Sequence, residues 1–361
     1  MRIPLFDIQT PIAPLRGQLS DAAARTIESG SFILGPEVEA FEAEFAAYVG
    51  TRHAVGVANG TDALTIALRA MGVGPDDEVV VPSFTFYASA EAIPPTGARP
   101  VFCDVDPETM MVTANTVRAA ITPRTKAVIA VHLFGNVAPI AEIEALGVPV
   151  LEDAAQAAGS RGPAGRPGAL GTAATFSFFP SKNLGCLGDG GAITTDDDHL
   201  AEQARALRFH GSHDQTTWQY VGYNSRLDAI QAAFLRILLP HLDGWAGARR
   251  AAGEHYAAAG LGTHVCLPVA TPGAEPAWHL YVIRSPDVDR IAAGLAREQI
   301  AHKVYYRPAI HHHPAMAPYA PATPLTETDR LAETHLAIPI SPTLTGDQAR
   351  EVTECVAAAL G

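Results

Sequence analysis

The segment from Ser177 to Gly191, SFFPSKNLGCLGDGG, places one lysine among aromatic residues and glycines. The chain has only three lysines, Lys126, Lys182 and Lys303. A lysine amine has a pKa of about 10.4 in water, so it becomes a nucleophile at neutral pH only where burial disfavours its charged form. Such an amine can form a Schiff base with a carbonyl compound. The alternative for Lys182 is a structural side chain that extends past its aromatic neighbours to solvent.

A carboxylate ends the apolar run in VPVLEDAAQAAGS. If VPVLED is a strand, Asp153 lies at the rim of a sheet, where ligands of α/β proteins bind. Its neighbours are alanine and leucine, so its charge is costly unless a cation or a strong donor meets it. Gln156 follows three residues later and can face the same region. The alternative for Asp153 is the N-cap of a helix.

The segment VANGTDALTIAL contains a possible anion site. Asn59, Gly60 and Thr61 lie where a strand is expected to end and a helix to begin, and the free N–H groups of a helix N-terminus attract phosphate. The alternative is an ordinary cap by Thr61 or Asp62. A phosphate cradle, a carboxylate at a strand end and a Schiff-base lysine are together what pyridoxal 5′-phosphate requires.

The elements that must position these residues alternate between strands and helices over the first ~240 residues. The expected strands are 53–59, 77–84, 99–106, 125–135, 148–153, 173–179 and 190–195. The expected helices between and after them are 60–73, 85–97, 114–121, 140–147 and one long helix over 224–245. This alternation predicts an α/β fold with a mostly parallel central sheet and helices on both faces. We expect a large cofactor-binding domain over 1–240 and a smaller C-terminal α+β domain over 241–361, on which the first ~12 residues can pack.

Composition excludes some classes of partner. The net charge is −13 and hydrophobic residues make up 48% of the chain, which indicates a globular protein that binds neither nucleic acid nor an anionic membrane. The four cysteines are scattered without metal-ligand spacing, and no signal peptide or membrane span is evident. We therefore expect a cytoplasmic protein.

Six segments together resemble the DegT/DnrJ/EryC1/StrS aminotransferases, which are pyridoxal-phosphate enzymes of fold type I acting on nucleotide-linked keto-sugars. The segments are SFILGPEVEAFEAEFAAYVG, VANGTDALTIAL, VGPDDEVVVPSFTF, LEDAAQAAGS, FFPSKNLGCLGDGGAITT and YNSRLDAIQAAFL. The resemblance covers nearly the whole chain and is strongest over 31–240. It implies a homodimer with shared active sites and an amino acid donor, most simply L-glutamate.

The resemblance also implies roles for individual residues. Lys182 carries the cofactor and moves protons, Asp153 faces the pyridine nitrogen, and Gln156 lies by the ring hydroxyl. Gly60, Thr61 and Ser177 bind the phosphate. Phe86 covers the ring, unless it is an ordinary core residue.

Further matches concern the substrate and a partner subunit. Asn224 reaches the phosphate of the partner's cofactor, and Arg226 contacts substrate or, alternatively, pairs with Asp228 or a neighbouring carboxylate. Tyr305 and Tyr306 lie in a substrate loop, where Arg307 replaces a residue that is commonly proline or neutral in relatives.

Two features narrow the expected activity. A dehydrase branch of the family has histidine in place of the lysine, so Lys182 favours true amine transfer. KNLGCLGDGGA is closer to enzymes that aminate C3 of the sugar than to those that aminate C4. C4 amination, aminocyclitol synthesis and a non-catalytic cofactor-binding regulator remain the alternatives.

For His311, His312 and His313 we expect no metal site, because consecutive residues of an extended loop cannot all face one ion and no carboxylate cluster is evident.

Overall fold

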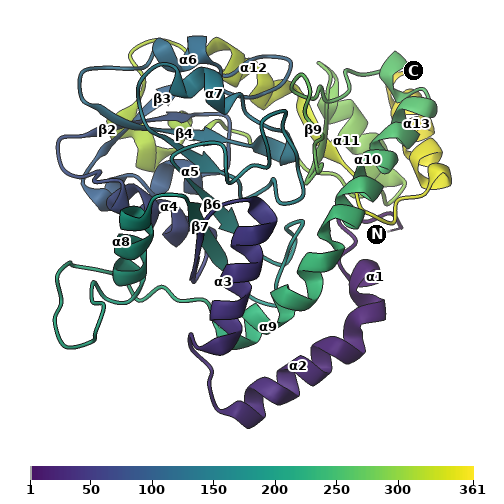
Figure 1. Cartoon of the computed structure of the whole chain (residues 1–361). Coiled ribbons are helices and arrows are strands. Elements are labelled where there is room, and N and C mark those ends of the chain that lie inside the picture. Colours follow the sequence, from purple (N-terminus) through teal and green to yellow (C-terminus); the bar gives the residue numbers. More distant parts are fainter. Residues whose placement is uncertain (1) are drawn as a thin grey trace.

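The computed structural model describes residues 2–361, and its centre is a seven-stranded sheet (Figure 1). The strands lie in the order β1 (His53–Val57), β7 (Gly191–Thr195), β6 (Ala173–Ser177), β5 (Val150–Asp153), β4 (Thr125–Val131), β2 (Glu78–Pro82) and β3 (Arg99–Cys103). β3, β2, β4, β5 and β6 are parallel, and β7 runs antiparallel to both of its neighbours. The predicted mostly parallel α/β fold is confirmed.

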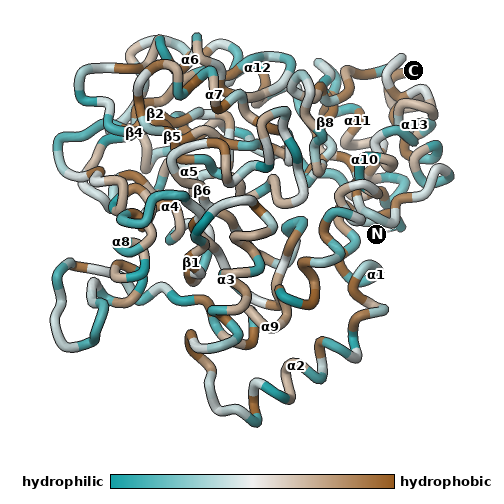
Figure 2. Tube along the Cα trace, in the orientation of Figure 1, coloured by the Kyte–Doolittle hydropathy of each residue, from teal (hydrophilic) through white to brown (hydrophobic). Residues whose placement is uncertain are grey.

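Helices cover both faces of this sheet because successive strand residues point to opposite sides. Val55 belongs to one hydrophobic core and its neighbour Ala54 to the other. The first core also contains residues of α4 (Gly60–Ala70) and α8 (Asp198–Arg208), and the second contains residues of α2 (Arg16–Ser29), α3 (Pro36–Val49) and α9 (Ala229–Leu238). Figure 2 shows hydrophobic residues running through the strands of the large sheet. Shorter helices are α1 (Gln9–Ile12), α5 (Ala88–Glu91), α6 (Ala114–Arg118) and α7 (Ile140–Glu144).

A second sheet pairs β8 (Tyr281–Arg284) with β9 (His335–Ile338) in antiparallel register. A separate core forms around it from α10 (Leu242–Ala258), α11 (Val288–Arg297) and α13 (Gly346–Leu360). Ile3 joins this core, and its carbonyl accepts a 2.9 Å hydrogen bond from the Ala301 N–H. By contrast, Ile310 and Leu331, from the 3-10 turn Ile310–His312 and from α12 (Thr326–Thr334), pack into the core of the large sheet. The division of the chain at residue 240 stays a prediction.

Two expected helices were wrong in extent. The helix expected over 224–245 begins only at Ala229 and is interrupted by the 3-10 turn Leu239–His241 before α10. Pro240 lies in this turn, and proline lacks the N–H that an uninterrupted helix would use. The helix expected over 85–97 is reduced to α5 and the 3-10 turn Pro94–Thr96. No helix of residues 2–361 is both long and apolar enough to cross a membrane.

Candidate active site

A cavity of about 620 Å³ opens beside the carboxyl ends of the parallel strands β5 and β6. Nine of the predicted site residues line it: Gly60, Thr61, Phe86, Asp153, Gln156, Ser177, Lys182, Tyr305 and Tyr306. They come from strand ends, the start of α4 and several loops far apart in the sequence. The structure therefore brings the predicted cofactor residues and the two tyrosines to one place.

Lys182 lies in the loop that joins β6 to β7. The loop folds back on itself, since the Cys186 N–H donates to the Phe178 carbonyl at 2.8 Å and the Lys182 N–H donates to the Phe179 carbonyl at 2.8 Å. Burial lowers the pKa of Lys182 to about 8, although the negative charge of Asp153 acts in the opposite direction. Roughly a fifth of this lysine is therefore a neutral amine near pH 7.4, far more than for a solvated lysine, so the alternative of a solvated structural lysine is disfavoured.

Asp153 is the last residue of β5, and its side chain is buried. The Ser89 hydroxyl donates a 2.7 Å hydrogen bond to Oδ2, and the Ala155 N–H donates to Oδ1 at 3.2 Å. Residues 154–159 form turns, so Asp153 is not a helix N-cap and that alternative was wrong. The buried carboxylate has one hydroxyl and one backbone donor, and it faces the cavity that contains Lys182.

Gln156 connects three segments around the cavity. Its Oε1 accepts a 2.8 Å hydrogen bond from the Phe134 N–H, and its Nε2 donates to the Tyr306 hydroxyl at 3.1 Å. The ring of Tyr306 lies 5.8 Å from that of Phe86, centroid to centroid. Burial raises the pKa of Tyr306, so its hydroxyl stays protonated. Phe86 is 51% exposed, which excludes the alternative that it is an ordinary core residue.

The predicted anion site lies where β1 leads into α4, and Asn59 caps this helix by accepting a 2.8 Å hydrogen bond from the Asp62 N–H. The alternative cap by Thr61 or Asp62 was therefore wrong. Among residues 2–361, no side chain or backbone group hydrogen-bonds to the Thr61 hydroxyl. A Cβ on Gly60 would lie 2.8 Å from the Cβ of Ser177, closer than such atoms approach. Only glycine therefore allows the helix N-terminus to lie this close to Ser177.

Asn224 and Arg226 lie outside the cavity within this single chain. The Arg226 guanidinium donates to the Asn224 side-chain oxygen and lies 5.2 Å from the centre of the Phe209 ring. Within residues 2–361, Arg226 forms no ion pair, so the alternative pairing with Asp228 or a neighbouring carboxylate is not observed. Arg307 also points elsewhere, because its guanidinium pairs with Asp289 at 3.2 Å.

Residues not predicted also line the cavity, and His279 is the most informative of them. His279 is 5% exposed, its ring stacks on Phe6 at 5.5 Å, and its Nδ1 is buried without a hydrogen-bond partner among the described residues. Burial and the nearby charge of Lys182 hold the pKa of His279 well below its usual range, so the ring is neutral. In the sequence, His279 directly precedes the apolar strand of WHLYVIR, and this position at a strand end could have marked it as a candidate site residue.

The chain matches the model of the DegT/DnrJ/EryC1/StrS aminotransferase family over residues 15–357. It belongs to this family. The predicted family membership is confirmed, and so is the class of the enzyme, an aminotransferase.

Individual family members are similar over almost their whole length. One is the dTDP-3-amino-3,4,6-trideoxy-alpha-D-glucose transaminase of Streptomyces venezuelae, which is 44% identical over 98% of this chain and 95% of its own. Another is the UDP-N-acetyl-3-dehydro-alpha-D-glucosamine 3-aminotransferase of Acidithiobacillus ferrooxidans, which is 42% identical over 98% of this chain and 97% of its own. The crystal structure of Streptomyces venezuelae DesV with a ketimine intermediate superposes with a TM-score of 0.94, at 43% identity over 98% of this chain and 97% of DesV.

Proposed function

We propose that this protein is a pyridoxal-phosphate-dependent aminotransferase that transfers an amino group from an amino acid to a nucleotide-linked 3-keto-sugar. The observation that carries the proposal is the cavity in which Lys182, with a pKa of about 8, lies near the buried Asp153. The sugar position is supported by two family members whose names specify amination at C3 of dTDP- and UDP-linked sugars.

The residues present fit the cofactor. The N-terminus of α4, the free Thr61 hydroxyl and Ser177 form a cradle for the phosphate, and a Cβ on Gly60 would narrow it. The buried Asp153 carboxylate is suited to a protonated ring nitrogen, and Gln156 to the ring hydroxyl. When bound, the cofactor supplies a carbonyl that condenses with amines and a ring that withdraws electrons from the reacting carbon.

The chain's own groups would then hold and move protons. Lys182, as a neutral amine, would accept a proton from the substrate carbon that bears the nitrogen and would return it to the carbon on the other side of that nitrogen, since its pKa lies near the working pH. Asp153, held by Ser89, stays positioned as the counter-charge throughout. Tyr306 and Phe86 partly close the cavity on one side and limit the access of water to it.

The active site is proposed to be completed by a second copy of the chain. Two segments project from the body of the molecule in Figure 1: α2 with the residues that follow it, and the loop after α8. Both carry exposed large hydrophobic side chains, which are Ile27, Phe32, Ile33, Trp218 and Val221. Asn224 and Arg226 continue from that loop, so a partner that covers it could receive their side chains near its own cavity. The proposed amino donor is L-glutamate. The proposed location is the cytoplasm, which is supported by the four cysteines because none of them forms a disulfide within residues 2–361.

The deciding experiment is spectroscopic and chemical. Purified protein loaded with pyridoxal phosphate should convert to the amine form on addition of L-glutamate, and the converted protein should aminate a nucleotide-linked 3-keto-sugar. Mass spectrometry of the reverse reaction, with 2-oxoglutarate and a panel of dTDP- and UDP-amino-sugars, identifies the substrate. Conversion with only 4-amino sugars would favour the C4 alternative, and cofactor binding without any conversion would favour the non-catalytic regulator.

A further inference from the structure

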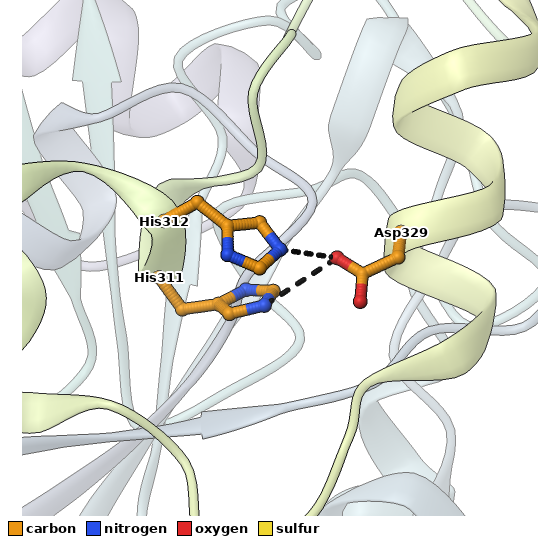
Figure 3. Close-up of side chains that lie close together, drawn as sticks. All are labelled: His311, His312 and Asp329. Atoms are coloured by element: carbon orange, nitrogen blue, oxygen red, sulfur yellow. Dashed lines mark hydrogen bonds and ion pairs between the residues drawn. The ribbon is translucent and has the colours of Figure 1, made fainter.

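A second cluster of potential ligands lies outside the active-site cavity. His311 and His312 belong to the 3-10 turn Ile310–His312 and not to an extended loop. Their Nε2 atoms lie 3.4 Å and 2.7 Å from the same Oδ1 of Asp329. Figure 3 shows both imidazole rings pointing at this carboxylate on α12. The premise of an extended loop was therefore wrong for His311 and His312, and one carboxylate, although not a cluster of them, lies beside both rings.

A further contact fixes the His311 side chain, and another holds the helix turn that carries Asp329. The other ring nitrogen of His311, Nδ1, is 2.7 Å from the hydroxyl of Ser83, a fully buried residue at the end of β2. Asp329 lies in the first turn of α12, and that turn is held because the Thr328 N–H donates to Asp104 at 2.7 Å. A hydrogen bond from the second nitrogen of a histidine to a fixed oxygen is what orients metal-binding imidazoles.

The third side chain can adjust. The His312 side chain is 52% exposed and that of Asp329 is 41% exposed, so the cluster opens to solvent on one side. Zinc bonds of 2.0–2.1 Å in a tetrahedron separate ligand atoms by about 3.3 Å. The 3.4 Å separation of His311 from Asp329 already matches this value, and rotation of the exposed His312 ring can widen its 2.7 Å separation.

We propose that His311 Nε2, His312 Nε2 and one carboxylate oxygen of Asp329 bind a divalent transition metal ion of the zinc type, with water completing the coordination. Imidazole and carboxylate are the ligands that suit such ions. Binding requires each imidazole to be neutral with its proton on Nδ1, which in His311 lies 2.7 Å from the Ser83 hydroxyl, so that Nε2 is free for the ion.

The bound ion would link two separate parts of the chain. The turn Ile310–His312 closely follows Tyr305 and Tyr306, which line the cavity, whereas Asp329 lies on α12. The bound ion would fasten the turn that follows Tyr305 and Tyr306 to α12, and it would lie outside the cavity. The expected effect is greater thermal stability of the metal-bound protein, because the ion binds only the folded arrangement.

The test uses full-length protein without a polyhistidine tag, treated with a chelator and then titrated with Co²⁺ and Zn²⁺. The wild type should give the visible absorption of a four-coordinate Co²⁺ site, bind one Zn²⁺ per chain by calorimetry and melt at a higher temperature with Zn²⁺. His312→Ala and Asp329→Asn should each weaken Zn²⁺ binding at least about tenfold.

His313→Ala is the matched control, because His313 is adjacent in sequence but packs on Tyr87 and not on Asp329. This variant should bind metal like the wild type. The proposal is overturned if the wild type binds no ion, or if His312→Ala binds Zn²⁺ as tightly as the wild type. His312 is exposed, so its replacement should not prevent folding, and circular dichroism verifies this.

Discussion

Ser89 and Asp153 are joined by a 2.7 Å hydrogen bond from the serine hydroxyl to the carboxylate Oδ2. Ser89 lies on α5 and Asp153 at the end of β5, so the bond fixes the carboxylate against a neighbouring helix. Hydrogen bonds to charged groups contribute about 1.5–3 kcal/mol. We therefore expect Ser89→Ala to lower kcat by about tenfold to a hundredfold while the protein still binds the cofactor.

The control for this variant is Thr96→Val, which removes another buried hydroxyl whose bonds remain within its own turn. Its kcat should match that of the wild type once the fraction of folded protein is taken into account. Equal activity of Ser89→Ala and wild type would show that the orientation of Asp153 does not depend on Ser89.

The pKa of Lys182 predicts how fast the cofactor attaches at different pH values. The folded-state pKa of about 8 lies below the ordinary 10.5, so the neutral amine dominates above pH 8. The rate of cofactor attachment should rise about tenfold per pH unit below pH 8 and level off above it. Stopped-flow absorbance of the cofactor-free protein measures this profile.

Asp153→Asn tests the electrostatic part of the same argument. The charge of Asp153 raises the pKa of Lys182, so its removal should move the levelling of the attachment rate to a lower pH. The surface variant Asp21→Asn should leave the profile unchanged. A shift of the profile to higher pH in Asp153→Asn would contradict the assignment.

Replacement of Gly60 in the proposed phosphate cradle is predicted to lower both stability and cofactor affinity. In Gly60→Ala the new Cβ would meet the Cβ of Ser177 at 2.8 Å, so either the helix N-terminus or the strand end has to move. Overpacking of this kind costs about 1–3 kcal/mol of stability. Fluorescence titration should also reveal weaker cofactor binding, whereas Gly74→Ala, where no atom lies within 4 Å of the added Cβ, should change neither property.

His279 should separate stability from activity. Its Nδ1 is buried without a hydrogen-bond partner among residues 2–361, so His279→Phe, which keeps the stacking on Phe6 and removes this polar group, should raise the melting temperature. If the nitrogen serves a ligand in the cavity, kcat/KM of the same variant falls. His335→Phe is the control, because His335 also has a buried unpaired nitrogen but lies outside the cavity, and its activity per folded molecule should be unchanged. A His279→Phe enzyme with full activity would make the residue purely structural.

The proposed contribution of Asn224 to the partner's site can be tested by complementation. Lys182→Ala and Asn224→Ala chains are expected to be impaired separately. If sites are shared, a refolded equal mixture contains dimers with one intact site and recovers roughly a quarter of the wild-type activity. If Asn224 serves only its own chain, no mixed dimer has an intact site and activity does not recover.

The sequence was sufficient to predict the sheet and the meeting of Lys182, Asp153 and Gly60 at one cavity. Lys182, Asp153 and Gly60 lie next to strand ends, and the carboxyl ends of parallel strands converge at one edge, so local patterns determine their meeting. His279 was missed because its approach to Lys182 depends on how the segment before β8 packs against the large sheet. The partnership of His311 and His312 with Asp329 was missed for a similar reason, since α12 and the preceding turn meet only through tertiary packing. Pro240 is a residue that ends or bends helices, but the apolar periodicity on both sides of it favoured a single long helix over 224–245.

The residues that line the cavity come from two kinds of structural element. Asp153 and Ser177 lie at strand ends and Gly60 at the start of the helix that follows β1, whereas Tyr305 and Tyr306 come from the loop that follows α11. Loops accept substitutions and length changes more readily than strands do. A change of sugar preference therefore requires only a change in the loop of Tyr305 and Tyr306, and an engineer who seeks a new acceptor can diversify that loop while keeping Lys182, Asp153 and Gly60 in place.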